Sequence, residues 1–269
     1  MNIGSLFQGG LDGLLYGLLA VGIVLVYRSS RFLNLAHGQL GALPAVLLAK
    51  LVLTEGLGYW PSLILCLAVG AGTGVLVERF LVAPLLAKTS SGVSPLLLTI
   101  GVAQLLAALM FIKWLQPDLA KYVSQGYPLP FHVKFVIGGV IFGGQYTAIL
   151  IFCPILVIGL TVFLRYSVMG KMIRAAASNR EAARLCGISP ALVSAVTWGL
   201  AGALSTFSAV LASPSQTIAV GGTGSSSLGP DDLLLALGAA AFGAFTSVPW
   251  ALVGGVVIGI ASRITAIET

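Results

Sequence analysis

The side chains best suited to chemistry gather in one short charged segment, residues 166 to 190. Arg180 and Arg184 lie four residues apart, so on a helix they share one face. Small or apolar side chains surround them, namely Ala182, Ala183 and Leu185. A face this small buries too little surface to belong to a core. The segment therefore predicts a helix that docks into a socket on a partner protein, with contact to anionic lipid as the alternative.

Helix boundary signals delimit this segment. Ser178 and Glu181 have the spacing of a capping box, in which each side chain bonds to a backbone N–H of the first turn. Gly187 suits the left-handed position just past a helix end, and Pro190 suits the first turn of the next helix. These signals predict a short helix over residues 179 to 186.

Ionisable side chains are scarce inside the apolar runs, where such groups are candidates for function by default. Asp12 lies at least one turn inside the first run, and His37 begins the second. Glu78 and Arg79 end the third run, where both can reach the membrane surface. Proton-coupled transport needs a buried carboxylate or a histidine relay, and only Asp12 qualifies. A secondary transporter or channel for small polar solutes therefore stays the rival hypothesis.

Catalysis and cofactor binding are not indicated. His37 and His132 fall in separate segments without metal-ligand spacing. Cys66, Cys153 and Cys186 form no paired or metal-binding motif, and the first two are expected in the core. No Gly-x-x-x-x-Gly-Lys-Ser/Thr phosphate loop occurs. We expect no enzyme, no cofactor and no metal, and the chain cannot itself be an ATPase.

The chain is mostly apolar, and this composition decides which class of protein positions these residues. Of 269 residues 58% are hydrophobic, and only 14 Lys and Arg and 8 Asp and Glu carry charge. A soluble domain has roughly 25% charged residues and a disordered chain has low hydrophobicity, so both classes are excluded. The isoelectric point of 9.4 is explained by basic loop residues that orient a membrane protein, so we expect no nucleic-acid partner.

Apolar runs long enough to cross a bilayer divide the chain into helices. The predicted spans are residues 5 to 27, 34 to 53, 60 to 82, 93 to 112, 145 to 165 and 190 to 212. A last run, residues 233 to 262, is interrupted at residues 246 to 249. It predicts a hairpin of two short helices, with one long kinked helix as the alternative. The expected fold is an all-α polytopic transmembrane helical bundle of about eight membrane segments, in a single domain over residues 1 to 269.

The basic residues predict the orientation of this bundle. With the N-terminus outside, most of the 14 Lys and Arg fall in inside loops, and positive residues favour the cytoplasmic side. The segment 166 to 190 is then cytoplasmic, and the loops 113 to 144 and 213 to 232 face outward. Residues 1 to 10 carry no basic residue, so no cleavable signal peptide is expected.

Glycine occupies 34 positions, and several glycines lie four residues apart. Lipid tails are as apolar as leucine, so membrane helices associate through small residues that let backbones approach. The pairs that predict close helix packing are Gly13 and Gly17, Gly70 and Gly74, Gly139 and Gly143, and Gly255 and Gly259.

Four ordered motifs resemble one family. The segment 166 to 190 is similar to the coupling loop of ABC importer permeases, and in detail to the branched-chain amino acid permease family, through Gly170, Arg174-Ala175, Glu181-Ala182-Ala183, Leu185 and Gly187-Ile188. The stretch Asn34-Leu35-Ala36-His37-Gly38-Gln39, after Leu25-Val26-Tyr27, is similar to the family's Asn-Phe-Ala-His-Gly signature. Its third and fourth spans are matched by Glu78-Arg79, Pro84-Leu85 and Leu98-Thr99-Ile100-Gly101, and its last hairpin by Pro249, Gly254-Gly255 and Gly259.

The resemblance implies the translocation subunit of an ABC importer in the bacterial cytoplasmic membrane, in contact with membrane lipid. The implied substrates are branched-chain or related small amino acids, with urea or short amides as alternatives. The implied partners are a second homologous permease subunit, two cytoplasmic ATPase subunits and an extracytoplasmic substrate-binding protein. Residues expected in ATPase coupling are Ser178, Arg180, Glu181, Ala182, Ala183, Arg184, Leu185, Gly187 and Ile188. Candidates for the gate or substrate path are Asn34, His37, Gly38, Gln39, Thr99 and Gly101.

Two of these candidates also have local interpretations. Asn34 suits the N-cap of the second span, because its side chain can accept from an early backbone N–H. His37 would follow in the first turn. Two roles stay open for it: a structural hydrogen bond that ties the preceding loop to the bundle, and a place in the gate.

The chain departs from the family pattern at several positions. Asp231 and Asp232 stand where members usually carry Lys, Trp250 follows Pro249 where members have Gly, and Asp12 replaces an apolar or hydroxyl residue. The chain also stops one span before the usual end of the family, which suggests a truncated chain or the first part of a fused permease.

Overall fold

A computed structural model describes residues 3–88, 93–118, 121–122, 127–131, 133–215 and 230–268. The helices are α1 (Ile3–Ser30), α2 (His37–Leu53), α3 (Tyr59–Val77), η1 (Glu78–Val82), α4 (Ala83–Lys88), α5 (Val93–Met110), α7 (Gly144–Tyr166), α8 (Val168–Ser178), α9 (Arg180–Leu185), α10 (Pro190–Ala212), η2 (Ser213–Ser215), α11 (Pro230–Phe242) and α12 (Val248–Glu268). The strands β1 (Phe135–Ile137) and β2 (Val140–Phe142) form one antiparallel hairpin. The predicted helical membrane bundle is confirmed.

Six helices of the described chain are long and apolar enough to cross a membrane, and α2 and α11 are apolar but shorter. The third predicted span continues without a break from α3 through the π-helical η1 into α4 and ends at Lys88 rather than at residue 82. The predicted helical hairpin near the C-terminus is present, because Ala244 and Phe245 adopt positive φ angles of 47° and 56° and end the helical path between α11 and α12. A single kinked helix is therefore wrong. The second arm was predicted to be short, but α12 has 21 residues.

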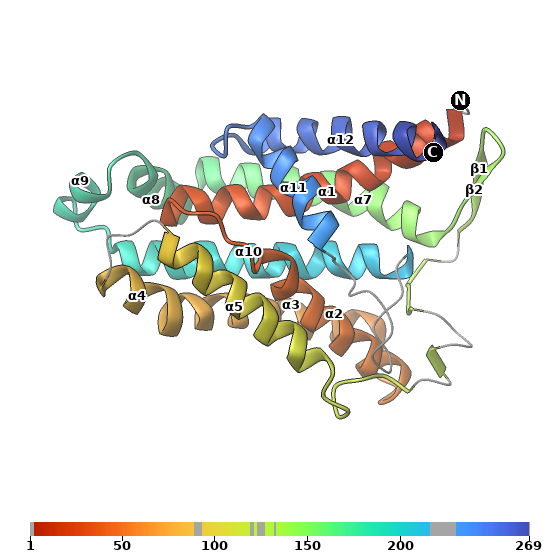
Figure 1. The fold of residues 1–269 in the computed structure, drawn as a ribbon, viewed down its shortest axis with the longest axis horizontal. Coiled ribbons are helices and arrows are strands. Elements are labelled where there is room, and N and C mark those ends of the chain that lie inside the picture. The colour runs from red at the N-terminus through yellow and green to blue at the C-terminus, as the bar shows by residue number, and fades with distance from the viewer. Residues whose placement is uncertain are drawn as a thin grey trace.

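The long helices run roughly along one axis of the bundle (Figure 1). Both chain ends lie at one end of that axis, close to the β1–β2 hairpin, and α8 and α9 lie at the opposite end. The helices α1 and α12 pack antiparallel along much of their length, and α10 contacts α1, α2 and α3. Because α1 and α10 are largely buried, they form the centre of the bundle.

Glycine governs the contact between α1 and α12, as the spacing predicted. A Cβ atom added to Gly13 would lie 2.6 Å from the carbonyl oxygen of Gly255. One added to Gly9 would lie 2.8 Å from the carbonyl oxygen of Gly259. The two backbones therefore touch, and any larger side chain would force them apart.

A second glycine contact joins α3 to α10. Gly70 and Gly74 of α3 lie against the backbone of α10, where Gly202 faces Gly70. The remaining predicted pair, Gly139 and Gly143, does not pack helices. Gly139 lies in the turn of the β1–β2 hairpin with φ of 81°, and Gly143 precedes α7. The tight turn needs a positive φ, which glycine supplies without strain.

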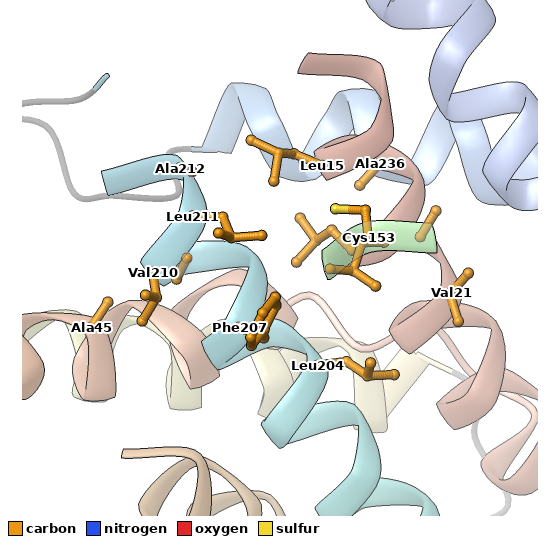
Figure 2. Close-up of a cluster of buried hydrophobic side chains, with 14 of the residues drawn as sticks. Leu15, Val21, Ala45, Cys153, Leu204, Phe207, Val210, Leu211, Ala212 and Ala236 are labelled. Carbon is orange, nitrogen blue, oxygen red and sulfur yellow. The ribbon is translucent and has the colours of Figure 1, made fainter. Parts of the chain in front are cut away.

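The largest hydrophobic cluster surrounds the second half of α10 (Figure 2). Leu204 and Phe207 of α10 lie among side chains from α1 and α7, including Leu15 and Cys153. Cys66 and Cys153 are buried and unpaired, as predicted. The cluster joins helices that are far apart in the sequence into one core.

The loop between α5 and α7 is attached to the bundle by hydrogen bonds. The hydroxyl of Tyr127 donates to the carbonyl oxygen of Ala45 at 3.0 Å, and burial raises the pKa of Tyr127 well above its usual range. The backbone N–H of Asp118 donates to Thr54 at 2.9 Å. Asp118 therefore lies at the end of α2, and Tyr127 lies against the middle of that helix.

Candidate functional site

The charged segment forms two consecutive helices, α8 and α9, and its cap differs from the predicted one. Asn179 has an extended backbone, and its side-chain oxygen accepts from the N–H of Ala182 at 3.0 Å, so it is the N-cap of α9. Ser178 still belongs to α8 and donates to the carbonyl oxygen of Ala175 at 2.8 Å. The predicted capping box is therefore wrong. Asn and Ser are both good caps, and the helical backbone at Ser178 decides between them.

The predicted end of the short helix is confirmed. Gly187 has φ of 80°, in the left-handed region. The N–H of Gly187 donates to the carbonyl oxygen of Arg184, and the N–H of Ile188 donates to that of Ala183, both at 3.0 Å. This pair of bonds is the Schellman motif of a helix C-terminus. Pro190 then opens α10 in its first turn, as expected.

Most of α9 is exposed within the described chain. Leu185 is 90% exposed at the end of the bundle that carries α8 and α9 (Figure 1). Glu181, Ala182 and Arg184 are exposed too, whereas Ala183 is buried. An apolar side chain among charges on a protruding helix is suited to a protein contact.

The inner face of this segment is tied to the end of α1 by two hydrogen bonds. Arg180 donates from Nη2 to the carbonyl oxygen of Ser29, near the end of α1, at 2.9 Å. Arg31, just past α1, donates to the carbonyl oxygen of Ala177 in α8. Arg180 and Arg184 do share one side, as predicted, but Arg180 is bound to the bundle. This hydrogen bond connects α9 directly to the end of α1.

A pocket lies between α9, the end of α3 and the start of α10, lined in part by Glu78, Arg180, Arg184 and Ser194. Glu78 is only 3% exposed and hydrogen bonds to Ser194. It was expected to reach the membrane surface, and the structure turns it inward against α10. Glu78 also begins the π-helical stretch η1, a helix form that often occurs at functional sites. Sequence reasoning missed this inward position of Glu78, because an isolated Glu-Arg pair at a span end has no distinctive spacing.

The predicted gate residues fall mostly at one buried junction of α1, α2 and α5. Asn34, His37 and Thr99 are fully buried. Thr99 of α5 accepts from the N–H of Leu35 at 3.2 Å and donates to Leu96 at 2.8 Å. Gly38 is buried beside His37, and Gln39 is half-buried. Gly101 does not join them, because it is exposed on the far side of α5 and faces open space.

The cap predicted at Asn34 is also wrong. Its side-chain oxygen accepts from the N–H of Ala36 at 3.0 Å and shapes the turn before α2, which begins at His37. Its Nδ2 is buried without a hydrogen-bond partner in the part of the chain described. The other expectation for Asn34, a place in the gate or substrate path, stays a prediction.

The imidazole of His37 fills a space that exists only because Gly22 of α1 has no side chain. A Cβ atom added at Gly22 would collide with the ring. The ring has a polar contact with the backbone of Leu19 in α1, but neither ring nitrogen forms a hydrogen bond of good geometry with a described residue. The backbone of His37 is fixed instead, because Ser205 of α10 donates to its carbonyl oxygen at 2.5 Å. Buried polar groups without a partner are uncommon, so this junction differs from the apolar core around it.

Asp12, for which the sequence offered no explanation, pairs with Arg263. Arg263 donates from Nε at 3.1 Å and from Nη2 at 2.8 Å to the same carboxylate oxygen. The pair joins α1 to α12 near the end where both termini lie. Asp12 therefore has a packing role, and Arg263 continues α12 past the end predicted at residue 262.

The amino-acid sequence is similar to those of known transport proteins. Residues 5–268 match the family described as the permease component of the branched-chain amino acid transport system. The chain is 28% identical to the high-affinity branched-chain amino acid transport system permease protein BraD of Pseudomonas aeruginosa, over 97% of this chain and 85% of that protein. It is 27% identical to LivH of Escherichia coli K12, over the same shares of both chains. No solved structure shows a significant match.

Proposed function

Because the chain belongs to the family of branched-chain amino acid transport permeases, we propose that it takes up branched-chain or related small amino acids with ATPase and binding-protein partners. The apolar helices make it a membrane protein, and it is a permease component rather than a member of an enzyme family. The observation that carries the proposal is the protruding α8–α9 segment, which is exposed on its outer face and bonded to α1 on its inner face.

The exposed tip of α9 is the docking surface for a cytoplasmic ATPase subunit. Leu185 supplies the apolar contact. The positive charge of Arg184 favours an ATPase surface with acidic residues around that contact. The helix is only six residues long, but it is capped at both ends by Asn179 and Gly187. The caps make it a rigid lever that can transmit a push.

The force then reaches the spans through short polar connections. The hydrogen bond from Arg180 to Ser29 transmits the movement of α9 to the end of α1. The residues that line the pocket around Glu78 transmit it to the end of α3 and the start of α10. The π-helical stretch η1 absorbs the change between α3 and α4, because its hydrogen bonds are already displaced from the α-helical pattern. Two packings of the same helices, selected by the ATPase subunits, give alternating access.

The remaining partners are assigned by position. The end of the bundle with α8 and α9 faces the cytoplasm, so the N-terminus and the 113 to 144 loop face outward. The substrate-binding protein then docks on the outer end, next to the β1–β2 hairpin. A second homologous permease and a pair of ATPase subunits complete the importer.

Uptake of labelled leucine into proteoliposomes that contain all partners tests this function. We expect uptake only when ATP and the binding protein are both present, and competition by isoleucine and valine. Uptake driven by an ion gradient without ATP would contradict the proposal. Competition by urea or acetamide, but not by amino acids, would replace the proposed substrate with the short-amide alternative.

Two variants of α9 separate docking from transmission. Leu185→Asp places a charge in the docking contact, so we expect loss of the ATPase subunit in a pull-down. Arg180→Gln removes the bond to Ser29, so we expect an intact complex with reduced uptake per ATP hydrolysed. Lys171→Gln, an exposed change on α8, is the control and should alter neither. Retention of the ATPase by the Leu185 variant would exclude the tip of α9 as the docking surface.

A further inference from the structure

A second pocket at the α8–α9 end of the bundle is lined by three arginines. Arg28 comes from the last turn of α1, Arg165 from the last turn of α7, and Arg174 from α8. The turn between α11 and α12 and the first residues of α12, at residues 246 to 249, complete the wall. The pocket therefore gathers positive side chains from three helices around one helix start.

Within the described chain, no carboxylate pairs with these positive charges. None of the three arginines forms a salt bridge within the described residues, and no acidic side chain lines the pocket. Arg174 is held in place because its guanidinium donates to the carbonyl oxygens of Leu164 and Arg165. The like charges of Arg174 and Arg31 act on Arg28. Like charges held this close repel one another, and a bound anion would remove that repulsion.

The start of α12 adds to the same positive potential. This helix is 21 residues long, and at its start the N–H groups of Val248 and Trp250 have no partner inside the helix. Pro249 has no N–H, and the N–H of Ala251 donates to the carbonyl oxygen of Ser247. The N-terminus of a helix carries a partial positive charge and commonly binds phosphate. Thr246 and Ser247 line the pocket directly before it. The hydroxyl of Thr246 donates to the carbonyl oxygen of Gly243 at 3.2 Å, so Ser247 brings the hydroxyl that can donate to a ligand. Arginine side chains, backbone N–H groups and hydroxyls are together the set that binds a phosphate.

The surroundings of the pocket indicate that the phosphate belongs to a lipid. Ile158 and Val162 lie on the same face of α7 as Arg165 and are exposed. On α12, Trp250 is 62% exposed directly after the pocket, and Val253 is exposed one turn later. Two apolar tracks therefore lead from the basic pocket along spanning helices. Tryptophan is enriched at the level of lipid headgroups, which fits the place of Trp250.

We propose that this pocket binds the phosphate of an anionic phospholipid, whose acyl chains lie along the exposed faces of α7 and α12. Arg28 and Arg165 contact the phosphate oxygens, and the start of α12 donates to them. Basic pockets between spanning helices bind anionic headgroups in other membrane proteins. The lipid connects α1, α7, α8 and α12, and so supports the base of the α8–α9 segment. The proposal is independent of the transported substrate.

Native mass spectrometry of the detergent-solubilised full-length protein tests this site. Phosphatidylglycerol is titrated against phosphatidylcholine of the same acyl chains. We expect one tightly bound phosphatidylglycerol per chain and no such phosphatidylcholine. Affinity should fall about fivefold for Arg28→Gln or Arg165→Gln and about 25-fold for both. Lys171→Gln lies on α8 outside the pocket and should bind like the wild type, and Arg165→Lys should keep most of the affinity.

Competition experiments distinguish a lipid phosphate from a soluble phosphate as the bound anion. Glycerol phosphate and inorganic phosphate, at the same concentrations, should not displace the lipid, because they lack the acyl chains. Displacement by either would show a soluble anion site and overturn the lipid assignment. Equal binding of both lipids, or unchanged binding in the double arginine variant, would also overturn it. If the double variant aggregates, Arg165→Gln decides alone, since that guanidinium forms no hydrogen bond in the described chain.

Discussion

Substitution of Gly187 tests whether a rigid α9 is needed for coupling. The residue has φ of 80°, and a Cβ atom added there would meet nothing within 4 Å. Any effect of Gly187→Val therefore comes from the backbone and not from a collision. The left-handed conformation costs an L-residue about 1–2 kcal/mol, and β-branched residues are the least tolerant.

This cost is large for so short a helix. With six residues, α9 depends on its caps, because short helices are marginal in water. A loss of about 1–2 kcal/mol lowers the ratio of formed to frayed helix roughly 5- to 30-fold. The two bonds that close the helix, from Gly187 to Arg184 and from Ile188 to Ala183, would be lost with it.

The assay compares leucine uptake with ATP hydrolysis in proteoliposomes that contain all partners. Gly187→Val should insert normally and hydrolyse ATP, with much less uptake per ATP. Gly187→Asn is the matched control, because asparagine tolerates the left-handed region, and it should remain close to the wild type. Equal uptake per ATP in the two variants would refute the idea that the glycine end of α9 transmits force.

Two further predictions concern packing between spans. Asp12→Leu leaves Arg263 without its partner and should destabilise the detergent-solubilised protein by about 1–2 kcal/mol, between the values for exposed and buried pairs. The exchange Asp12→Arg with Arg263→Asp should recover part of this loss in thermal unfolding, and no recovery would contradict a direct pair. Gly22→Ala should cost about 1–3 kcal/mol, because the new methyl group collides with the ring of His37. Adding His37→Ala should relieve that cost; the same loss with and without the ring would mean that the contact is absent.

Much of the bundle was predictable because lipid restricts the backbone to a few solutions. Runs of apolar residues located the spans, and the interruption before Pro249 located the helical hairpin. Span ends were less accurate, since η1 and α4 continue the third span to Lys88. Nothing in the hydropathy of that stretch distinguishes a π-helical continuation from a stop.

Within the candidate site, a prediction was reliable only where a backbone conformation favours one residue type almost alone. Gly187 was placed correctly because a left-handed helix end favours glycine almost alone. Ser178 was not, because Asn179 beside it caps a helix equally well and the choice depends on the backbone of α8. Gly101 shares a motif with Thr99 but lies on the other side of α5, since two residues of separation reverse the face of a helix.

By itself, the sequence determined that this chain lies in a membrane, how its apolar runs divide, and that a short basic helix stands between two spans. Those properties follow from local composition and residue spacing, which act on the backbone without any distant partner. Only the tertiary structure decided that Asp12 meets Arg263, that Glu78 turns inward, and that three arginines surround the start of α12. The reason is physical, because partners more than a hundred residues apart leave no local spacing to detect, and close packing of glycine surfaces brings them together.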